Sequence, residues 1–116
     1  MTKVIYYTTD NEDNPVKEFV HGLSASQKKK LVRILTYIEM YGLVTAIPHI
    51  KKLTGTPLWE IRILGQDNIR VLYASIEKDI ILVLHGFIKK SQKIPERELE
   101  TAISRLSNWI MRTKGA

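Results

Sequence analysis

The stretch that decides the fold is IILVLHGFIKKSQKIP, residues Ile80 to Pro95. Its first five residues are all apolar, which predicts a central strand with both faces covered. The residues that follow, from His85 to Lys93, are largely polar and basic, so the far end of this strand lies beside something charged. We therefore expect the functional edge of the protein at this strand end.

Two earlier segments alternate apolar and polar residues with the period of two that is typical of strands. They run from Leu58 to Ile63 and from Ile69 to Ala74. Short turns, at residues 65–68 and 77–79, join them to each other and to the strand that begins at Ile80. Three consecutive strands joined by short turns predict an antiparallel meander.

In this meander Arg62 and Arg70 lie on the less apolar faces of neighbouring strands, so they can sit side by side. On the third strand, strict alternation places five residues on one face: Ile81, Val83, His85, Phe87 and Lys89. We take as a hypothesis that this is the face of the two arginines. Lys89 and His85 would then join them.

The first part of the chain predicts one strand and two helices. Residues 3–8 are β-branched and aromatic, as strands are. Pro15 suits the first position of a short helix that is capped by Asn14. A capping box at residues 24–27 begins a second, longer helix, and Gly42 suits the residue after its last turn.

The remaining segments complete the expected architecture. Proline and glycine punctuate residues 43–57, which predicts a loop. Pro95 opens a last helix whose apolar residues form one stripe. The expected fold class is α+β, with a mainly antiparallel four-stranded sheet, two N-terminal helices and one C-terminal helix.

Length and charge narrow the class of partner. The 116 residues are enough for one domain, which we assign to residues 1–116. Lys and Arg number 18 against 12 Asp and Glu, and the resulting net charge of +6 favours polyanionic partners, with nucleic acid first. Alternatively, this charge only keeps a small domain soluble, and charge alone does not decide between the two interpretations.

Several classes of site and location have no support in the sequence. The chain has no cysteine, so it offers neither a disulfide framework nor a thiolate metal site. Its histidines, His21, His49 and His85, lie far apart without ligand-type spacing, so we expect no metal and no cofactor. No segment resembles a signal peptide or a membrane span, so we expect a cytoplasmic protein without a membrane partner.

Three segments in this order, Leu58 to Arg62, Arg70 to Tyr73 and His85 to Pro95, together with the order of the elements, resemble the RelE/HigB superfamily of toxins. More narrowly, they resemble its phage-associated, HigB-like branch. The resemblance covers nearly the whole chain, and its most specific part is His85 to Pro95. It implies a RelE-like fold and the toxin of a type II toxin–antitoxin module.

The activity that this resemblance implies is metal-independent cleavage of mRNA on translating ribosomes, which inhibits translation and growth. The implied partners are mRNA, the ribosome and a cognate antitoxin with a helix-turn-helix domain. Operator DNA would be reached only through the antitoxin.

The resemblance assigns roles at matching positions only. It implies catalytic roles for Arg62, Arg70 and Lys89. Lys90 matches as the second residue of the last-strand basic pair, whereas Lys51 and Lys52 match only by their location ahead of the second strand. We expect RNA binding by a basic and polar set: Lys51, Lys52, Lys90, Gln92 and Lys93. Some relatives carry a tyrosine or histidine near the chain end as the acid or base. Residues 113–116 offer neither, so the groups that transfer protons stay open.

Metal-free RNA cleavage needs a base for the 2′-hydroxyl, cations for the phosphorane and an acid for the leaving 5′-oxygen. Arg62 and Arg70 suit the cationic role, because a guanidinium matches phosphate oxygens and keeps its proton. His85 is a candidate acid or base, since the reference pKa of histidine is ~6.5. Alternatively, His85 is a structural residue packed beneath the C-terminal helix.

Two further bases come into question. Crowding among the basic residues could lower the pKa of Lys89 or Lys51. Glu60 shares the face of the arginines, where an ion pair that orients Arg62 is the favoured role over that of a base. Because no base stands out, a non-catalytic nucleic-acid-binding or regulatory module on the same fold remains the alternative.

Overall fold

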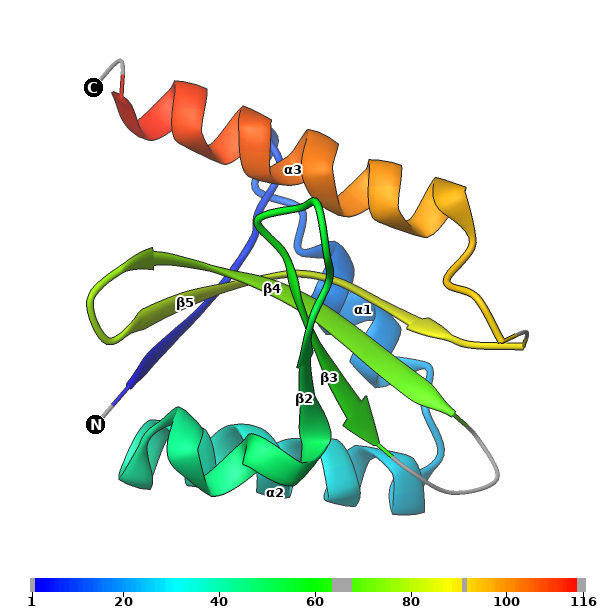
Figure 1. Ribbon diagram of the computed structural model, residues 1–116. Helices are drawn as coiled ribbons and strands as arrows, with labels where there is room; N and C mark the ends of the chain where they lie inside the picture. Colours follow the sequence, from blue (N-terminus) through cyan, green and yellow to red (C-terminus); the bar gives the residue numbers. More distant parts are fainter. Residues whose placement is uncertain (1, 64–67, 91, 115–116) are drawn as a thin grey trace.

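The computed structural model describes residues 2–63, 68–90 and 92–114 (Figure 1). The elements follow in chain order: β1 (Lys3–Tyr6), α1 (Pro15–His21), α2 (Ala25–Tyr41), the 3-10 helix η1 (Leu43–His49), β2 (Ile50–Lys52), β3 (Trp59–Ile63), β4 (Ile69–Glu77), β5 (Ile80–Ile88) and α3 (Glu96–Lys114). In the described part of the chain, five strands form one mixed sheet in the order β1-β5-β4-β3-β2. The α+β class expected from the sequence is confirmed.

The centre of the sheet is the predicted antiparallel meander of β3, β4 and β5. Its register places Arg62 opposite Arg70, as the alternation of the two segments predicted. β1 pairs in parallel with β5 and forms one edge of the sheet. Of the turn expected at residues 65–68, all but Asn68 lies outside the described residues.

The prediction of four strands, two N-terminal helices and a loop over residues 43–57 is wrong in this loop. Residues 43–49 form η1, which buries Ala46. Residues 50–52 form β2, which pairs antiparallel with β3 at the other edge of the sheet. A strand of three residues is too short to show a period of two in the sequence. β2 is therefore recognised only from its pairing with β3 in the structure.

Both faces of the sheet are covered (Figure 1). One face packs against α1, α2 and η1, through a core that includes Leu31, Ile38, Val71 and Tyr73. The other face packs against α3, and its core includes Leu72, Leu82, Leu84, Ala102 and Leu106. This double cover explains why the segment from Ile80 to Leu84 is apolar on both faces.

The start of α1 and both ends of α2 are those that the sequence predicted, whereas α3 begins at Glu96, one residue after the predicted Pro95. The Asn14 side chain accepts a hydrogen bond from the backbone N–H of Lys17, and Pro15 is the first residue of α1. Ser24 and Gln27 form both hydrogen bonds of the capping box at the start of α2. Gly42 follows α2 with a φ of 89°, a conformation that favours glycine.

The prediction that side chains along β5 alternate strictly between the two faces of the sheet is wrong beyond Val83. Val83 pairs with Tyr73, but the next residue of β4, Leu72, pairs with His85, so Leu84 is an extra residue in a β-bulge. Ile81 and Val83 therefore face α1 and α2, whereas His85 and Phe87 lie with Leu84 on the face covered by α3. The bulge, rather than simple parity, brings His85 to the face of the arginines.

No helix among residues 2–63, 68–90 and 92–114 is both long enough and apolar enough to cross a membrane.

Candidate functional site

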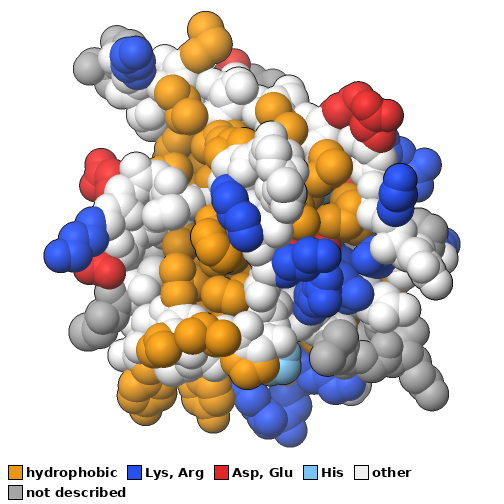
Figure 2. All heavy atoms as spheres, viewed as in Figure 1, with side chains coloured by type: hydrophobic (Ala, Val, Ile, Leu, Met, Phe, Trp, Pro, Cys, Tyr) orange, Lys and Arg blue, Asp and Glu red, His pale blue; other side chains and the backbone are white. Residues whose placement is uncertain are grey.

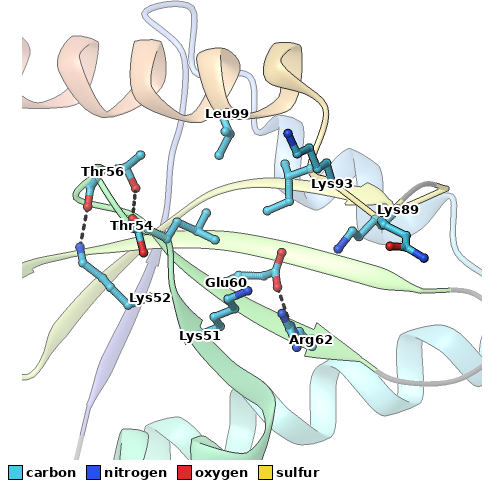
Figure 3. Close-up of a pocket in the computed structure, with 12 residues that line it drawn as sticks. Lys51, Lys52, Thr54, Thr56, Glu60, Arg62, Lys89, Lys93 and Leu99 are labelled. Atoms are coloured by element: carbon cyan, nitrogen blue, oxygen red, sulfur yellow. Dashed lines mark hydrogen bonds and ion pairs between the residues drawn. The ribbon is translucent and has the colours of Figure 1, made fainter.

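A cavity of about 350 Å³ opens on the α3 face of the sheet, near the end of β5 (Figure 3). Five segments line it: β2, β3, the loop between them, the residues after β5 and the first turns of α3. The functional edge that the sequence placed at the end of β5 therefore coincides with a cavity.

One wall of the cavity is cationic. Lys51 projects from β2, Arg62 from β3, and Lys89 follows β5 directly. Figure 2 shows Lys and Arg side chains gathered over β2 and β3, with hydrophobic side chains next to them toward α3. Lys51 is exposed, and Arg62 keeps 35% of its side chain exposed. Both are accessible to a ligand from solvent.

Arg70 lies behind this wall and is only 7% exposed. It lines a second cavity of about 360 Å³, together with Asn68, Lys89, Lys90 and Gln92. Lys89 and Gln92 line both cavities, so the two cavities adjoin. The structure thus brings Arg62, Arg70 and Lys89 into one basic region.

Glu60 lies at the base of the cationic wall and is 1% exposed. Its Oε1 accepts a hydrogen bond of 2.7 Å from Nε of Arg62 and lies 3.7 Å from Nε of Arg70. At 3.7 Å, Arg70 and Glu60 form an ion pair but no hydrogen bond. The ion pair between Glu60 and Arg62 that the sequence suggested is present, and the carboxylate also counters the charge of Arg70.

The opposite wall is apolar. It is formed by Leu53 from the loop between β2 and β3, Ile94 from the loop before α3, and Leu99 from α3. The sequence interpretation missed this wall, because its residues come from segments that are remote in the chain and carry no common period. The cavity therefore offers cations on one side and an apolar surface on the other.

The chain matches a family model described as phage derived protein Gp49-like (DUF891) over residues 18–107. The match spans most of the chain and includes every residue that lines the cavity. This protein belongs to the Gp49-like family. The family is associated with RelE-like and toxin-like phage proteins. No curated protein sequence matches the chain.

The other residues expected to bind RNA in this Gp49-like protein line one or both of the two adjoining cavities. The Lys52 side chain makes two contacts with nearby residues. Its Nζ donates a hydrogen bond of 2.6 Å to the carbonyl of Thr56 and lies 5.4 Å from the ring centroid of Trp59. Gln92 and Lys93 are exposed side chains that line the cavity. Lys90 lines the second cavity only.

His85 lies on the same face of the sheet as the arginines but lines neither cavity. Its Nε2 is 3.1 Å from Oε1 of Glu98, and its Nδ1 is 3.2 Å from Nη1 of Arg105. Its ring stacks on Phe87 with 5.6 Å between the centroids. These contacts place His85 beneath α3, as the alternative interpretation of the sequence expected.

Burial lowers the pKa of His85, and Arg105 adds to this effect. The contact with Glu98 raises the pKa of His85 and opposes the shift only in part. The imidazole is therefore held predominantly neutral at pH 7.

Metal binding has no visible basis in the described residues, where no three His, Cys, Asp or Glu side chains come together. The chemistry that this site can perform is that of its cations and of Glu60. Fixed guanidinium and ammonium groups bind and stabilise a negatively charged phosphate.

Proposed function

We propose that this Gp49-like protein is the toxin of a type II toxin–antitoxin module, from the HigB-like branch, and an endoribonuclease that cleaves mRNA on translating ribosomes. The observation that carries the proposal is the convergence of Lys51, Arg62 and Lys89 on one cavity, with Arg70 behind them. These residues come from four segments, so the cluster depends on the fold and is not a charge run in the sequence.

The two walls of the cavity match the two parts of a nucleotide. The cationic wall suits a phosphodiester, and its charge is worth more in a cavity than in open water. The apolar wall of Leu53, Ile94 and Leu99 suits the flat face of a nucleobase. A net charge of +6 adds a long-range attraction to RNA and to the ribosome.

In this proposal Arg62 and Lys89 contact the scissile phosphate and stabilise the charge that develops on it. Arg70 supports them from its buried position, and Lys51 binds the neighbouring backbone. The protein acts in the cytoplasm without a metal. A cognate antitoxin with a helix-turn-helix domain silences it and carries the complex to operator DNA.

The test is induced expression followed by mapping of mRNA ends. The protein should arrest growth and produce cuts inside translated reading frames, and Arg62→Ala or Lys89→Ala should relieve both effects. Lys78→Ala removes one positive charge from the exposed turn between β4 and β5, away from the cavity, and should stay toxic. If both cavity variants cut as well as the wild type, this site is not the catalytic centre.

A second candidate is a non-catalytic RNA-binding module on the same fold. It is favoured by the position of His85, which is packed beneath α3 and so removes the most obvious acid or base from the cavity. This module would bind RNA with a steep salt dependence and give no cleavage products, with or without ribosomes.

A further inference from the structure

The carboxylate of Glu60 uses only one of its two oxygens within the protein. Oε1 contacts Arg62 and Arg70, whereas Oε2 is buried and has no hydrogen-bond partner among the described residues. Figure 3 shows one oxygen turned to Arg62 and the other turned away from it, into the cavity toward α3. The ion pair with Arg62 therefore leaves a proton acceptor at the floor of the cavity.

An unfilled buried oxygen of this kind carries a cost. A buried acceptor without a donor destabilises a protein, and it does so more strongly when the acceptor is charged. Arg70 Nε, 3.7 Å from Oε1, is also buried without a hydrogen-bond partner in the described part of the chain, and it does not bond to Oε2. A group that enters the cavity beside Glu60 can supply the donor. Such oxygens in native proteins call for an explanation, and a ligand with a hydrogen-bond donor provides one.

The neighbours of Oε2 define the donor. Arg62 and Lys89 in the same cavity select a phosphate, so the donor has to lie close to a phosphate on the ligand. In RNA this donor is the ribose 2′-hydroxyl, on the carbon next to the one that bears the 3′-phosphate. The N–H groups of the bases lie farther from the backbone, and DNA lacks the hydroxyl.

We propose that Glu60 is a catalytic residue whose Oε2 accepts the proton of the 2′-hydroxyl at the cleaved nucleotide. This inference rests on the proposed endoribonuclease function, and it gives Glu60 the base role that the sequence interpretation ranked below an ion pair with Arg62. Arg62 then has two tasks: its Nε holds Oε1, and the rest of its guanidinium contacts the phosphate beside the attacked bond.

The step balances with groups that are present. The 2′-O–H bond breaks, its proton passes to Oε2, and the freed electron pair forms the 2′-O–P bond. The P–O5′ bond breaks, and the 5′-oxygen takes a proton from a water molecule. Glu60 releases its proton to solvent. The products are a 2′,3′-cyclic phosphate and a 5′-hydroxyl, with no net consumption of protons.

The experiment is single-turnover cleavage of mRNA on programmed ribosomes by the full chain, at subsaturating and saturating protein concentrations. Glu60→Gln keeps the shape of the side chain and should slow cleavage by at least ~10²-fold, the usual contribution of a general base. The loss should persist when the protein is in saturating excess over RNA. Glu60→Asp keeps the charge and should cleave faster than Glu60→Gln. Glu100→Gln removes an exposed acidic charge from α3 and should behave as the wild type.

A purely structural role for Glu60 predicts a different pattern. Glu60→Gln would then lower the melting temperature and the affinity for RNA, while the cleavage rate at saturating protein stayed close to that of the wild type. That result would overturn the inference and leave the endoribonuclease function standing.

RNA and DNA binding measurements distinguish failure of the base role of Glu60 from failure of the proposed endoribonuclease function. If the wild-type protein cleaves no RNA, the endoribonuclease proposal and the base role fall together. The contact itself is then decided by affinities for a single-stranded RNA and for the DNA of the same sequence. The wild type should prefer RNA, and Glu60→Gln should lose most of this preference. An unchanged ratio would show that Oε2 does not contact the 2′-hydroxyl.

Discussion

Among the described glycines, Gly86 is the one where an added methyl group would meet the closest neighbours. It lies in β5 opposite Val71 and faces the ring of Phe19 in α1. A Cβ at this position would lie 2.4 Å from Cδ2 and 2.7 Å from Cε2 of that ring. Only glycine lets α1 approach β5 this closely, which explains the glycine between His85 and Phe87 in the most specific segment of the sequence.

The expected size of the effect follows from this geometry. The clash is with ring atoms that pack against the core under α1 and α2, and not with the end of a flexible side chain. Overpacking of such a site costs typically about 1–3 kcal/mol. For a chain of this length we take roughly 4 °C of melting temperature per kcal/mol, so Gly86→Ala should melt roughly 4–12 °C below the wild type.

The assay is a double-mutant cycle of Gly86→Ala and Phe19→Ala, followed by thermal and urea unfolding. Removal of the ring makes room for the methyl group, so the double variant should be more stable than the sum of the single effects by about 1–3 kcal/mol. Gly22→Ala is the matched control, because a Cβ there meets no atom closer than 3.6 Å. Additive effects in the cycle, or a Gly86→Ala protein as stable as the wild type, would refute the reasoning.

Three further predictions concern charge and capping. Lys89→Ala should lower the salt slope of single-stranded RNA binding by about 0.7, whereas Lys78→Ala should leave it unchanged. The pKa of His85 is lower in the folded protein than in the unfolded chain, where it is ~6.5. The unfolded chain therefore binds a proton first as the pH falls, so the stability that neutral His85 contributes above pH ~6.5 is lost on acidification. Unfolding between about pH 7.5 and 5.5 should therefore depend less on pH in His85→Gln, and equal slopes would contradict this. Ser24→Ala removes the cap of α2 and should lower the free energy of unfolding by about 0.5–2 kcal/mol in urea titrations; no change would count against the cap.

The features that could be predicted from the sequence are those set by local rules. The period of two in β3 and β4, with a short connection, fixes which residues face each other, so the pairing of Arg62 with Arg70 followed directly. The caps of α1 and α2 depend on neighbouring residues, as in the bonds between Ser24 and Gln27. Both kinds of feature need no knowledge of distant segments.

The features that could not be predicted depend on distant segments. The bulge at Leu84 moves His85 to the α3 face, and nothing in an unbroken apolar run marks where alternation stops. The position of His85 is then fixed by Glu98 and Arg105, which α3 supplies from 13 and 20 residues away. The apolar wall of the cavity has the same origin, since Leu99 also comes from α3.

The pairing of Arg62 with Arg70 explains why a buried carboxylate belongs in this site. Like charges directly opposite on neighbouring strands destabilise a sheet, and Arg70 is almost completely buried. Glu60 counters both guanidinium groups through the same oxygen, Oε1. Glu60→Gln therefore removes this compensation as well as the proposed base, and it should lower stability even if catalysis does not involve Oε2. The two effects differ in one observable: loss of compensation lowers the unfolding transition, whereas loss of the base lowers the cleavage rate even at saturating protein.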